Sequence, residues 1–281
     1  MDPFKDGSGA RLRDVGQHEI VDMTVCFRFF FFAKDDSHMI IHSKLDKDPL
    51  SEWKAIFAVE DWIDKNHDSR PTTSFGLRSD WIRAYIDCPV MIWYHMCLSN
   101  NASSMTVVSN GKTISENLGS GNKPMPKEFL SNMFIMRAST PEETEEKQFY
   151  SMFGKMTDVN IWNYSMTVEE MKSWTNCKNK YGEGNVVNWE TAEWTTWYLE
   201  VEILDKSELC RKEEHGLTIF PQERPFMKSV ELCKRLGGTM AVANSETKSQ
   251  EMIALREEWK DNCTGDNIWA CLLYTSDAAD E

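Results

Sequence analysis

Short segments with the alternating pattern of a β-strand follow one another from residue 24 to residue 204, separated by polar turns. In the clearest of them, Val25, Phe27, Phe29 and Phe31 occupy every second position, as on one face of a strand. Many short strands of this kind are typical of an antiparallel β-sandwich. The other segments with this pattern are 38–42, 53–59, 74–77, 81–87, 90–98, 105–109, 112–115, 132–137, 152–162, 185–189 and 198–204.

Two local motifs interrupt or join these strands. Asn110-Gly111, between two of the segments, is a strong signal for a tight hairpin. Residues 167–175 predict one short helix, because Thr167 and Glu170 have the spacing of a capping box. Val168, Met171 and Trp174 would lie on one face of that helix.

Trp189, Trp194 and Trp197 gather near the end of this region. One interpretation is that their rings close the edge of the hydrophobic core. The other is that they form a platform on which a sugar ring stacks.

The pattern changes after residue 206. A strand-like segment, 217–220, precedes a helical pattern over 225–236 that Gly237-Gly238 ends, and a second helical pattern covers 246–260. We therefore expect a domain boundary near 204–209. The predicted organisation is an incomplete lead-in (1–23), a β-sandwich (24–204), a partial α+β domain (205–270) and a separate tail (271–281).

Charge and hydropathy exclude two broad classes of partner. Acidic residues outnumber basic ones, 45 to 31, and no basic patch stands out, which argues against nucleic-acid binding. No apolar run reaches the roughly 18 residues of a membrane span, so membrane insertion is not expected.

The cysteines and sequons favour an extracellular setting, either secreted or as an ectodomain. The eight cysteines include no Cys-x-x-Cys pair of a zinc site. Asn101, Asn163 and Asn262 each begin an N-glycosylation sequon. Residues 1–20 contain no apolar segment of a signal peptide, so we expect Met1 to be internal to a longer chain. Residues 271–281 resemble a translated sequencing adapter and are predicted to have no packing role.

Residues 24–190 resemble the pentraxin family of the laminin-G and concanavalin-like sandwiches. The resemblance implies a jelly-roll sandwich and a disulfide between Cys26 and Cys97, which would stabilise the fold by roughly 2–4 kcal/mol. Cys88 and Cys177 have no family partner, and they could pair with each other. The resembling segments are Thr24–Arg28, His95–Ser99, Asn110–Lys112, Gly154–Trp162 and Gly184–Trp189.

The pentraxin resemblance also implies calcium, which that family holds with carboxylates and amides on two loops. The corresponding loop here, residues 137–148, has Ala138-Ser139-Thr140 where the acidic ligands would stand. We therefore expect weak calcium binding or none. The substitute ligands that the sequence offers are Asp48, Glu142, Glu143 and Glu145; the alternative is an acidic loop in solvent.

The second region is similar to the opening of a C-type lectin-like domain. Cys233 would normally pair with a cysteine near the end of such a domain, and the sugar-selecting motifs of that family would follow residue 270. Residues 205–270 are therefore not expected to fold alone. The resembling residues are Phe226, Cys233, Leu236–Gly238, Met240–Val242, Ser245, Glu246 and Trp269.

Together the two resemblances imply an extracellular recognition fragment that binds a carbohydrate or glycoconjugate. Passive spacer domains of a receptor or adhesion protein are the alternative. Pentraxins often form rings, but nothing in this sequence identifies a subunit interface. A glycosidase would need two facing carboxylates, such as Glu200 and Glu202, or Glu60 with a partner. No motif supports these pairs or a catalytic His95, so we expect no enzyme.

Overall fold

The computed structural model describes two compact units, residues 1–88 with 92–203, and residues 204–281 with 89–91. Each unit is presented by itself. Among the described residues, no helix is both long and apolar enough to cross a membrane. The residues described are 8–13, 20–32, 37–44, 55–63, 71–77, 80–84, 92–101, 104–115, 130, 133–136, 152–178, 182–205, 209–210, 216–219, 226–235, 238–243, 245–259 and 270–273.

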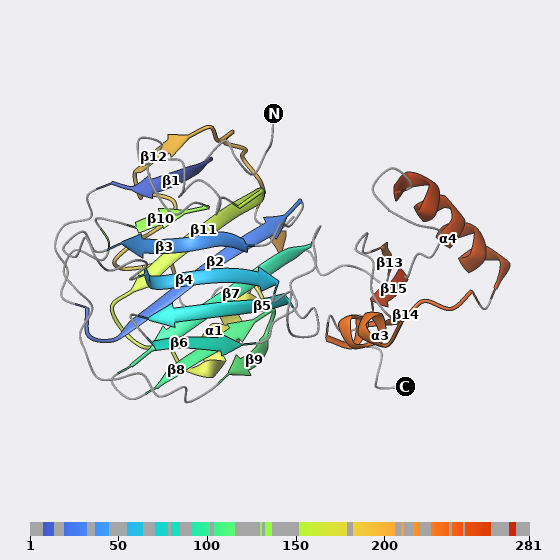
Figure 1. The fold of residues 1–281 in the computed structure, drawn as a ribbon, viewed down its shortest axis with the longest axis horizontal. Helices are drawn as coiled ribbons and strands as arrows, with labels where there is room; N and C mark the ends of the chain where they lie inside the picture. The colour runs from blue at the N-terminus through green and yellow to red at the C-terminus, as the bar shows by residue number, and fades with distance from the viewer. Residues whose placement is uncertain are drawn as a thin grey trace. The chain divides into compact units, whose positions relative to one another are not determined.

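The first unit is a sandwich of two antiparallel sheets, which confirms the predicted fold class (Figure 1). One sheet has seven strands in the order β12-β1-β10-β3-β4-β5-β6. The other has five strands in the order β11-β2-β7-β8-β9. The bounds are β1 Gly9–Leu12, β2 Met23–Phe31, β3 Ser37–Lys44, β4 Ala55–Ile63, β5 Pro71–Leu77, β6 Asp80–Ala84, β7 Trp93–Asn100, β8 Met105–Ser109, β9 Lys112–Ser115, β10 Met133–Ile135, β11 Gly154–Trp162 and β12 Trp194–Trp197.

Strand β2 lies between β11 and β7, and both of its faces are buried along most of its length. Phe27, Phe29 and Phe31 alternate onto the face toward the other sheet and are fully buried. The ring of Phe29 packs against Phe31 at 5.4 Å and against Tyr94 of β7 at 5.0 Å. The core of the sandwich therefore forms around the phenylalanine run of the sequence.

Helix α1 (Val168–Thr175) covers the face of the five-stranded sheet that points away from the seven-stranded sheet, and it contacts β7, β8 and β9. Its predicted capping box is present: Glu170 N donates to Thr167 Oγ1, and Thr167 N donates to the Glu170 carboxylate at 2.7 Å. The hairpin between β8 and β9 turns at Asn110 and Gly111, both with positive φ, as predicted. Gly111 has φ 74°, which favours glycine, and a Cβ there would also require the Asn176 side chain to move, because it would lie 2.4 Å from Asn176 Oδ1.

Three sequence expectations about the sandwich are wrong. Strand β1 lies inside the segment predicted as a lead-in, and it joins β10 to β12 in the seven-stranded sheet. The last strand is Trp194–Trp197, whereas residues 198–204 have no strand structure, because Tyr198 takes a positive φ that ends the extended backbone. Residues 185–189 contribute one bridge, Val187 to Ile161, instead of a strand.

The second unit has a three-stranded sheet in the order β13-β15-β14, with β13 Gly216–Ile219, β14 Gly238–Met240 and β15 Ala270–Leu273. Helices α3 (Phe226–Arg235) and α4 (Glu246–Trp259) lie where helical patterns were predicted. The C-type lectin resemblance of this unit stays a prediction.

The expectation that the tail after residue 270 has no packing role is wrong for residues 271–273. They belong to β15, the central strand, which pairs with both β13 and β14. The physical reason is that Cys271-Leu272-Leu273 continues an apolar run that suits a central strand. Residues 274–281 lie outside the described part of the chain.

Candidate functional site

The disulfide that the pentraxin resemblance implied is present on the outer face of the five-stranded sheet. Cys26 of β2 and Cys97 of β7 are directly opposed, with Cα atoms 4.1 Å apart. The bond closes a sequence separation of 71 residues, a loop for which chain entropy gives about 4 kcal/mol of stabilisation. Both cysteines are fully buried under α1, in contact with a cluster that includes Trp162, Met171 and Trp174.

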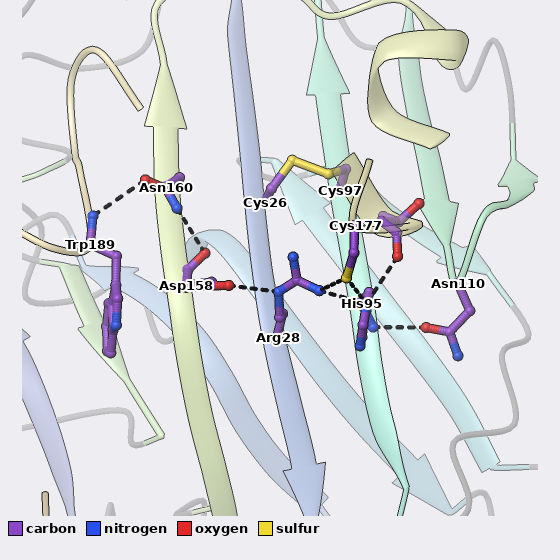
Figure 2. Close-up of polar contacts among 10 residues, drawn as sticks. Cys26, Arg28, His95, Cys97, Asn110, Asp158, Asn160, Cys177 and Trp189 are labelled. Atoms are coloured by element: carbon purple, nitrogen blue, oxygen red, sulfur yellow. Dashed lines mark hydrogen bonds and ion pairs between the residues drawn. A yellow bond between two sulfur atoms is a disulfide. The ribbon is translucent and has the colours of Figure 1, made fainter. Parts of the chain in front are cut away.

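Two residues from the cysteines on the same strands, Arg28 and His95 form a row of polar side chains with Asp158, beside the disulfide (Figure 2). The Arg28 Nε donates to Asp158 Oδ2 at 2.7 Å, and Arg28 Nη1 lies 2.6 Å from His95 Nδ1. The guanidinium also lies over the Trp174 ring, 4.4 Å from its centroid. Arg28 and Asp158 are both buried, so this row is an ion pair inside the protein.

A β-bulge in β11 brings the carboxylate to the arginine. Thr157 opposes Arg28 and Asn160 opposes Cys26, so two residues of β11 fit against one residue of β2. Asp158, within the bulge, has φ 54°, a left-handed conformation that aspartate tolerates better than most residues. Burial lowers the pKa of the Arg28 guanidinium from its ordinary value, and Asp158 opposes that shift.

His95 links the arginine to the end of α1. Its Nδ1 lies 2.9 Å from the Thr175 carbonyl oxygen as well as 2.6 Å from Arg28 Nη1. One nitrogen cannot serve both contacts at once, because it must accept from the guanidinium and donate to the carbonyl. The tautomer of His95 therefore decides which of the two contacts is a hydrogen bond, and its position between two elements is that of a structural histidine.

Cys177 completes this group, which we name the Arg28 cluster: Arg28, His95, Asp158, Thr175 and Cys177. The Cys177 Sγ accepts a hydrogen bond from Arg28 Nη1 at 2.9 Å, just beyond the end of α1. Cys177 is disulfide-bonded. Cys88, the partner that the sequence offered, lies outside the described residues, so that pairing stays a prediction.

The second unit also contains disulfide-bonded cysteines. Cys210 and Cys233 are both in this state. Cys233 is therefore bonded, although the C-type lectin resemblance pairs it with a cysteine near the end of the domain, which this sequence lacks. The sequence could not show this, because cysteine connectivity does not follow from spacing alone.

Asn160 connects the region of the disulfide to the tryptophans. Its Oδ1 accepts from the backbone N–H groups of Gly184 at 3.0 Å and Trp189 at 3.3 Å, while its Nδ2 donates to the Asp158 carbonyl. Figure 2 shows Asn160 between Trp189 and the bulge. A Cβ on Gly184 would lie 1.9 Å from the Val187 carbonyl oxygen, so the chain passes here only with glycine.

The three tryptophans do not share one surface. Trp194 opposes the buried Leu12 of β1, which places it on the inner face of the sheet, and its ring packs against Trp189 at 5.6 Å. Trp197 is three positions further along β12, so it lies on the outer face. There its ring stacks on Phe134 of β10, with centroids 6.5 Å apart.

Two arginines of the β1 segment flank this outer aromatic pair. The Arg11 guanidinium lies 5.7 Å from the centre of the Phe134 ring. Arg13 Nε donates to Thr195 Oγ1 at 3.1 Å, and Arg13 also forms an exposed ion pair with Glu193 at 3.6 Å. We name this surface the outer patch: Arg11, Arg13, Phe134, Thr195 and Trp197.

The structure describes only some of the remaining predicted site residues. Asn163 is exposed at the end of β11, where its Oδ1 accepts from Asn185 Nδ2 at 2.7 Å. Asn101 is half-buried, and its Oδ1 accepts from Ser104 N at 2.9 Å. The glycosylation candidate Asn262 and the calcium candidates Asp48, Glu142, Glu143 and Glu145 lie outside the described residues.

The two described carboxylates considered for a glycosidase, Glu200 and Glu202, are exposed. Glu202 lies 2.5 Å from Lys155 Nζ at the surface. The side chain of Glu60 is outside the described set. Within the described part of the chain, no group of three or more His, Cys, Asp or Glu side chains could hold a metal ion.

Sequence reasoning missed the Arg28 cluster and the outer patch. The available signal was that Arg28 stands between Phe27 and Phe29 in a strand pattern. If both faces of that strand are buried, the arginine must be paired with a polar or charged partner. Strand β1, which supplies Arg11, spans four residues and gave no detectable alternation.

No protein-family model matches this sequence, and no curated protein matches it either. Solved structures that resemble it include a heptameric SAP-like pentraxin from Limulus polyphemus, with 15% identity, a TM-score of 0.49, and coverage of 69% of this chain and 92% of that chain. Domain 4 of an extracellular arabinanase from Geobacillus stearothermophilus, in complex with arabinotriose, has 14% identity, a TM-score of 0.42, and coverage of 59% and 72%. The sialidase carbohydrate-binding module from Ruminococcus gnavus, bound to α2,3-sialyllactose, has 10% identity, a TM-score of 0.42, and coverage of 60% and 94%. The likeness is weak, and the assignment of the fold rests on the strand order given above.

Proposed function

We propose that the sandwich is an extracellular, non-catalytic recognition module that binds carbohydrate at the outer patch. The observation that carries the proposal is the Trp197 ring, half-buried and stacked on Phe134, with the Arg11 and Arg13 guanidinium groups beside it. A sugar ring has an apolar face of C–H groups and a rim of hydroxyls. An aromatic face flanked by N–H donors complements both.

The local backbone favours this use of Trp197. Its directly opposed residue on β1 is Gly9, which has no side chain beside the indole. The indole can therefore lie over Phe134, and the buried Phe134 ring supports it from below. Tryptophan and arginine are also the residue types that contribute most to binding interfaces.

The extracellular part of the proposal rests on the cysteines. Cys26 and Cys97 in the first unit are bonded, and Cys210 and Cys233 in the second are also in disulfides. Bonds of this kind persist in oxidising compartments, whereas cytosolic thiols are kept reduced.

The test is binding of the disulfide-intact chain to an immobilised glycan array, followed by titration with the glycans retained. We expect Trp197→Ala to weaken binding at least about tenfold, equal to about 1.4 kcal/mol, while Trp197→Phe retains part of the affinity. Tyr164→Ala is the matched control, because Tyr164 is an exposed aromatic residue in the bend after β11, a strand of the other sheet. Retention of no glycan would favour spacer domains, and equal binding by Trp197→Ala would remove the outer patch from the proposal. Incubation of the retained glycans with the chain, with analysis for hydrolysis, tests the non-catalytic part.

A further inference from the structure

We propose that the disulfide containing Cys177 is redox-sensitive: a dithiol reduces it before Cys26–Cys97, and Arg28 stabilises the Cys177 thiolate that is released. The inference is independent of carbohydrate binding. It rests on the different surroundings of the two sulfur sites, which lie on the same face of the five-stranded sheet (Figure 2).

The Cys26–Cys97 bond lies in apolar surroundings. Both residues have 0% of their surface exposed, and they pack among Val108, Met171 and Trp174 of the cluster under α1. A reductant has no path to these sulfurs while α1 is in place. A thiolate formed there would also lose its hydration without gaining a charged partner.

The Cys177 sulfur is different on both counts. The residue is half-buried between the exposed residues Asn176 and Lys178, so a small dithiol can approach it. Its Sγ already accepts from Arg28 Nη1 at 2.9 Å, and His95 Nδ1 lies 3.7 Å away. A guanidinium in direct contact is the type of neighbour that stabilises a thiolate.

Arg28 can serve this role without leaving its carboxylate. Its Nε donates to Asp158, whereas its Nη1 faces the sulfur, so different N–H groups make the two contacts. The end of α1 opposes a thiolate here, because helix C-termini carry about half a negative charge. A charge-assisted hydrogen bond at 2.9 Å, in a half-buried position, outweighs that distributed partial charge, which falls off within one turn.

The reaction is an ordinary thiol–disulfide exchange. One thiolate of the dithiol attacks the half-buried Cys177 sulfur, and the cysteine bonded to Cys177 leaves and takes up a proton. The second thiol of the dithiol, after losing its proton to solvent, then attacks the dithiol sulfur of this mixed disulfide, and Cys177 leaves as the thiolate beside Arg28. Two electrons pass from the dithiol, which ends as a disulfide.

The experiment is a titration of the full chain with dithiothreitol under native conditions, with free thiols trapped by iodoacetamide and located by peptide mass spectrometry. Cys177 is expected to be alkylated at dithiothreitol concentrations that leave Cys26 and Cys97 unmodified. Arg28→Gln should raise the concentration for half-reduction of Cys177 by about tenfold, the effect of losing one charged hydrogen bond. Arg28→Lys should keep most of the wild-type sensitivity.

Lys155→Gln is the matched control, because Lys155 is a cation on the same sheet whose side chain contacts Glu202. It should leave the half-reduction concentration unchanged. Alkylation of Cys26 and Cys97 together with Cys177 in the wild type would overturn the proposal, whatever the fold of the variants. A folded Arg28→Gln chain with wild-type sensitivity would also overturn the role of Arg28.

Discussion

The two faces of strand β2 are both buried, yet different interactions hold them. Toward the seven-stranded sheet, β2 presents Phe27, Phe29 and Phe31, which pack as aromatic rings with no polar partner needed. Toward α1 it presents Cys26 and Arg28, which are fixed by a disulfide and an ion pair. One strand therefore has an apolar face and a face of specific pairings.

The difference follows from what covers each face. A whole sheet supplies enough apolar surface to bury large rings completely, and burial of one such side chain contributes about 1.5–3 kcal/mol. Helix α1 has eight residues and covers only part of the opposite face. Polar side chains at the edge of α1 lose contact with water when the helix covers them. They therefore need hydrogen-bonded partners within the protein.

The largest effect should come from the aromatic face. Phe29→Ala removes a fully buried ring that contacts three other aromatic rings, and we expect a loss of about 4 kcal/mol of unfolding free energy. Urea denaturation measures this change. Phe32→Ala, at a ring with 38% of its surface exposed, should cost less than about half as much. Equal losses from the two variants would show that the faces do not differ in this way.

The next effect concerns the ion pair of the opposite face. Arg28→Met leaves the Asp158 carboxylate buried and unpaired, for which we expect a loss of about 3 kcal/mol. The double variant Arg28→Met/Asp158→Asn removes both charges and retains a residue that tolerates the left-handed backbone at 158. It should be more stable than Arg28→Met alone in the same denaturation assay. If the stability losses of the single variants Arg28→Met and Asp158→Asn simply added in the double variant, the ion pair would not be what stabilises this face.

A smaller loss of stability should follow from weakening helix α1, which covers this face. Thr167→Ala removes the acceptor of the Glu170 N–H group at the start of α1 and should cost about 1 kcal/mol. Thr167→Ser keeps a hydroxyl acceptor and should remain close to the wild type. Thr196→Ala, at an exposed position of β12, is the control and should leave the urea midpoint unchanged. A Thr167→Ala chain with an unchanged midpoint would show that α1 does not depend on its cap.

The two faces also differ in how far the sequence could predict them. The aromatic face was predicted directly, because apolar residues with a period of two are the signal of a strand buried on one side. The helix and hairpin followed from local chemistry, the capping box at Thr167 and the Asn110-Gly111 turn. The Cys26–Cys97 pairing followed only from resemblance to a family.

The Arg28 cluster could not be predicted, because its members come from β2, β7, β11 and the end of α1. The bulge that turns Asp158 toward Arg28 is set by pairing between strands 130 residues apart in sequence. Strand β1 was missed for a related reason, since four residues carry too little pattern and gain their structure from β10 and β12. Local pattern therefore predicts the face covered by a sheet better than the face covered by a short helix.

The smallest effect is a titration on the α1 side of the sheet. Tyr164 has a raised pKa, chiefly because of partial burial and then because of the nearby Glu170 carboxylate. The neutral phenol is therefore favoured in the folded state, and the resulting stability is present below the ordinary tyrosine pKa and lost as the pH rises through the raised value. The difference in phenolate absorbance between the wild type and Tyr164→Phe reports this one residue among seven tyrosines. Glu170→Gln should lower the midpoint only in part, because burial is the larger cause. A return of the Tyr164 pKa to its ordinary value in Glu170→Gln would mean that the Glu170 charge, and not partial burial, raises it.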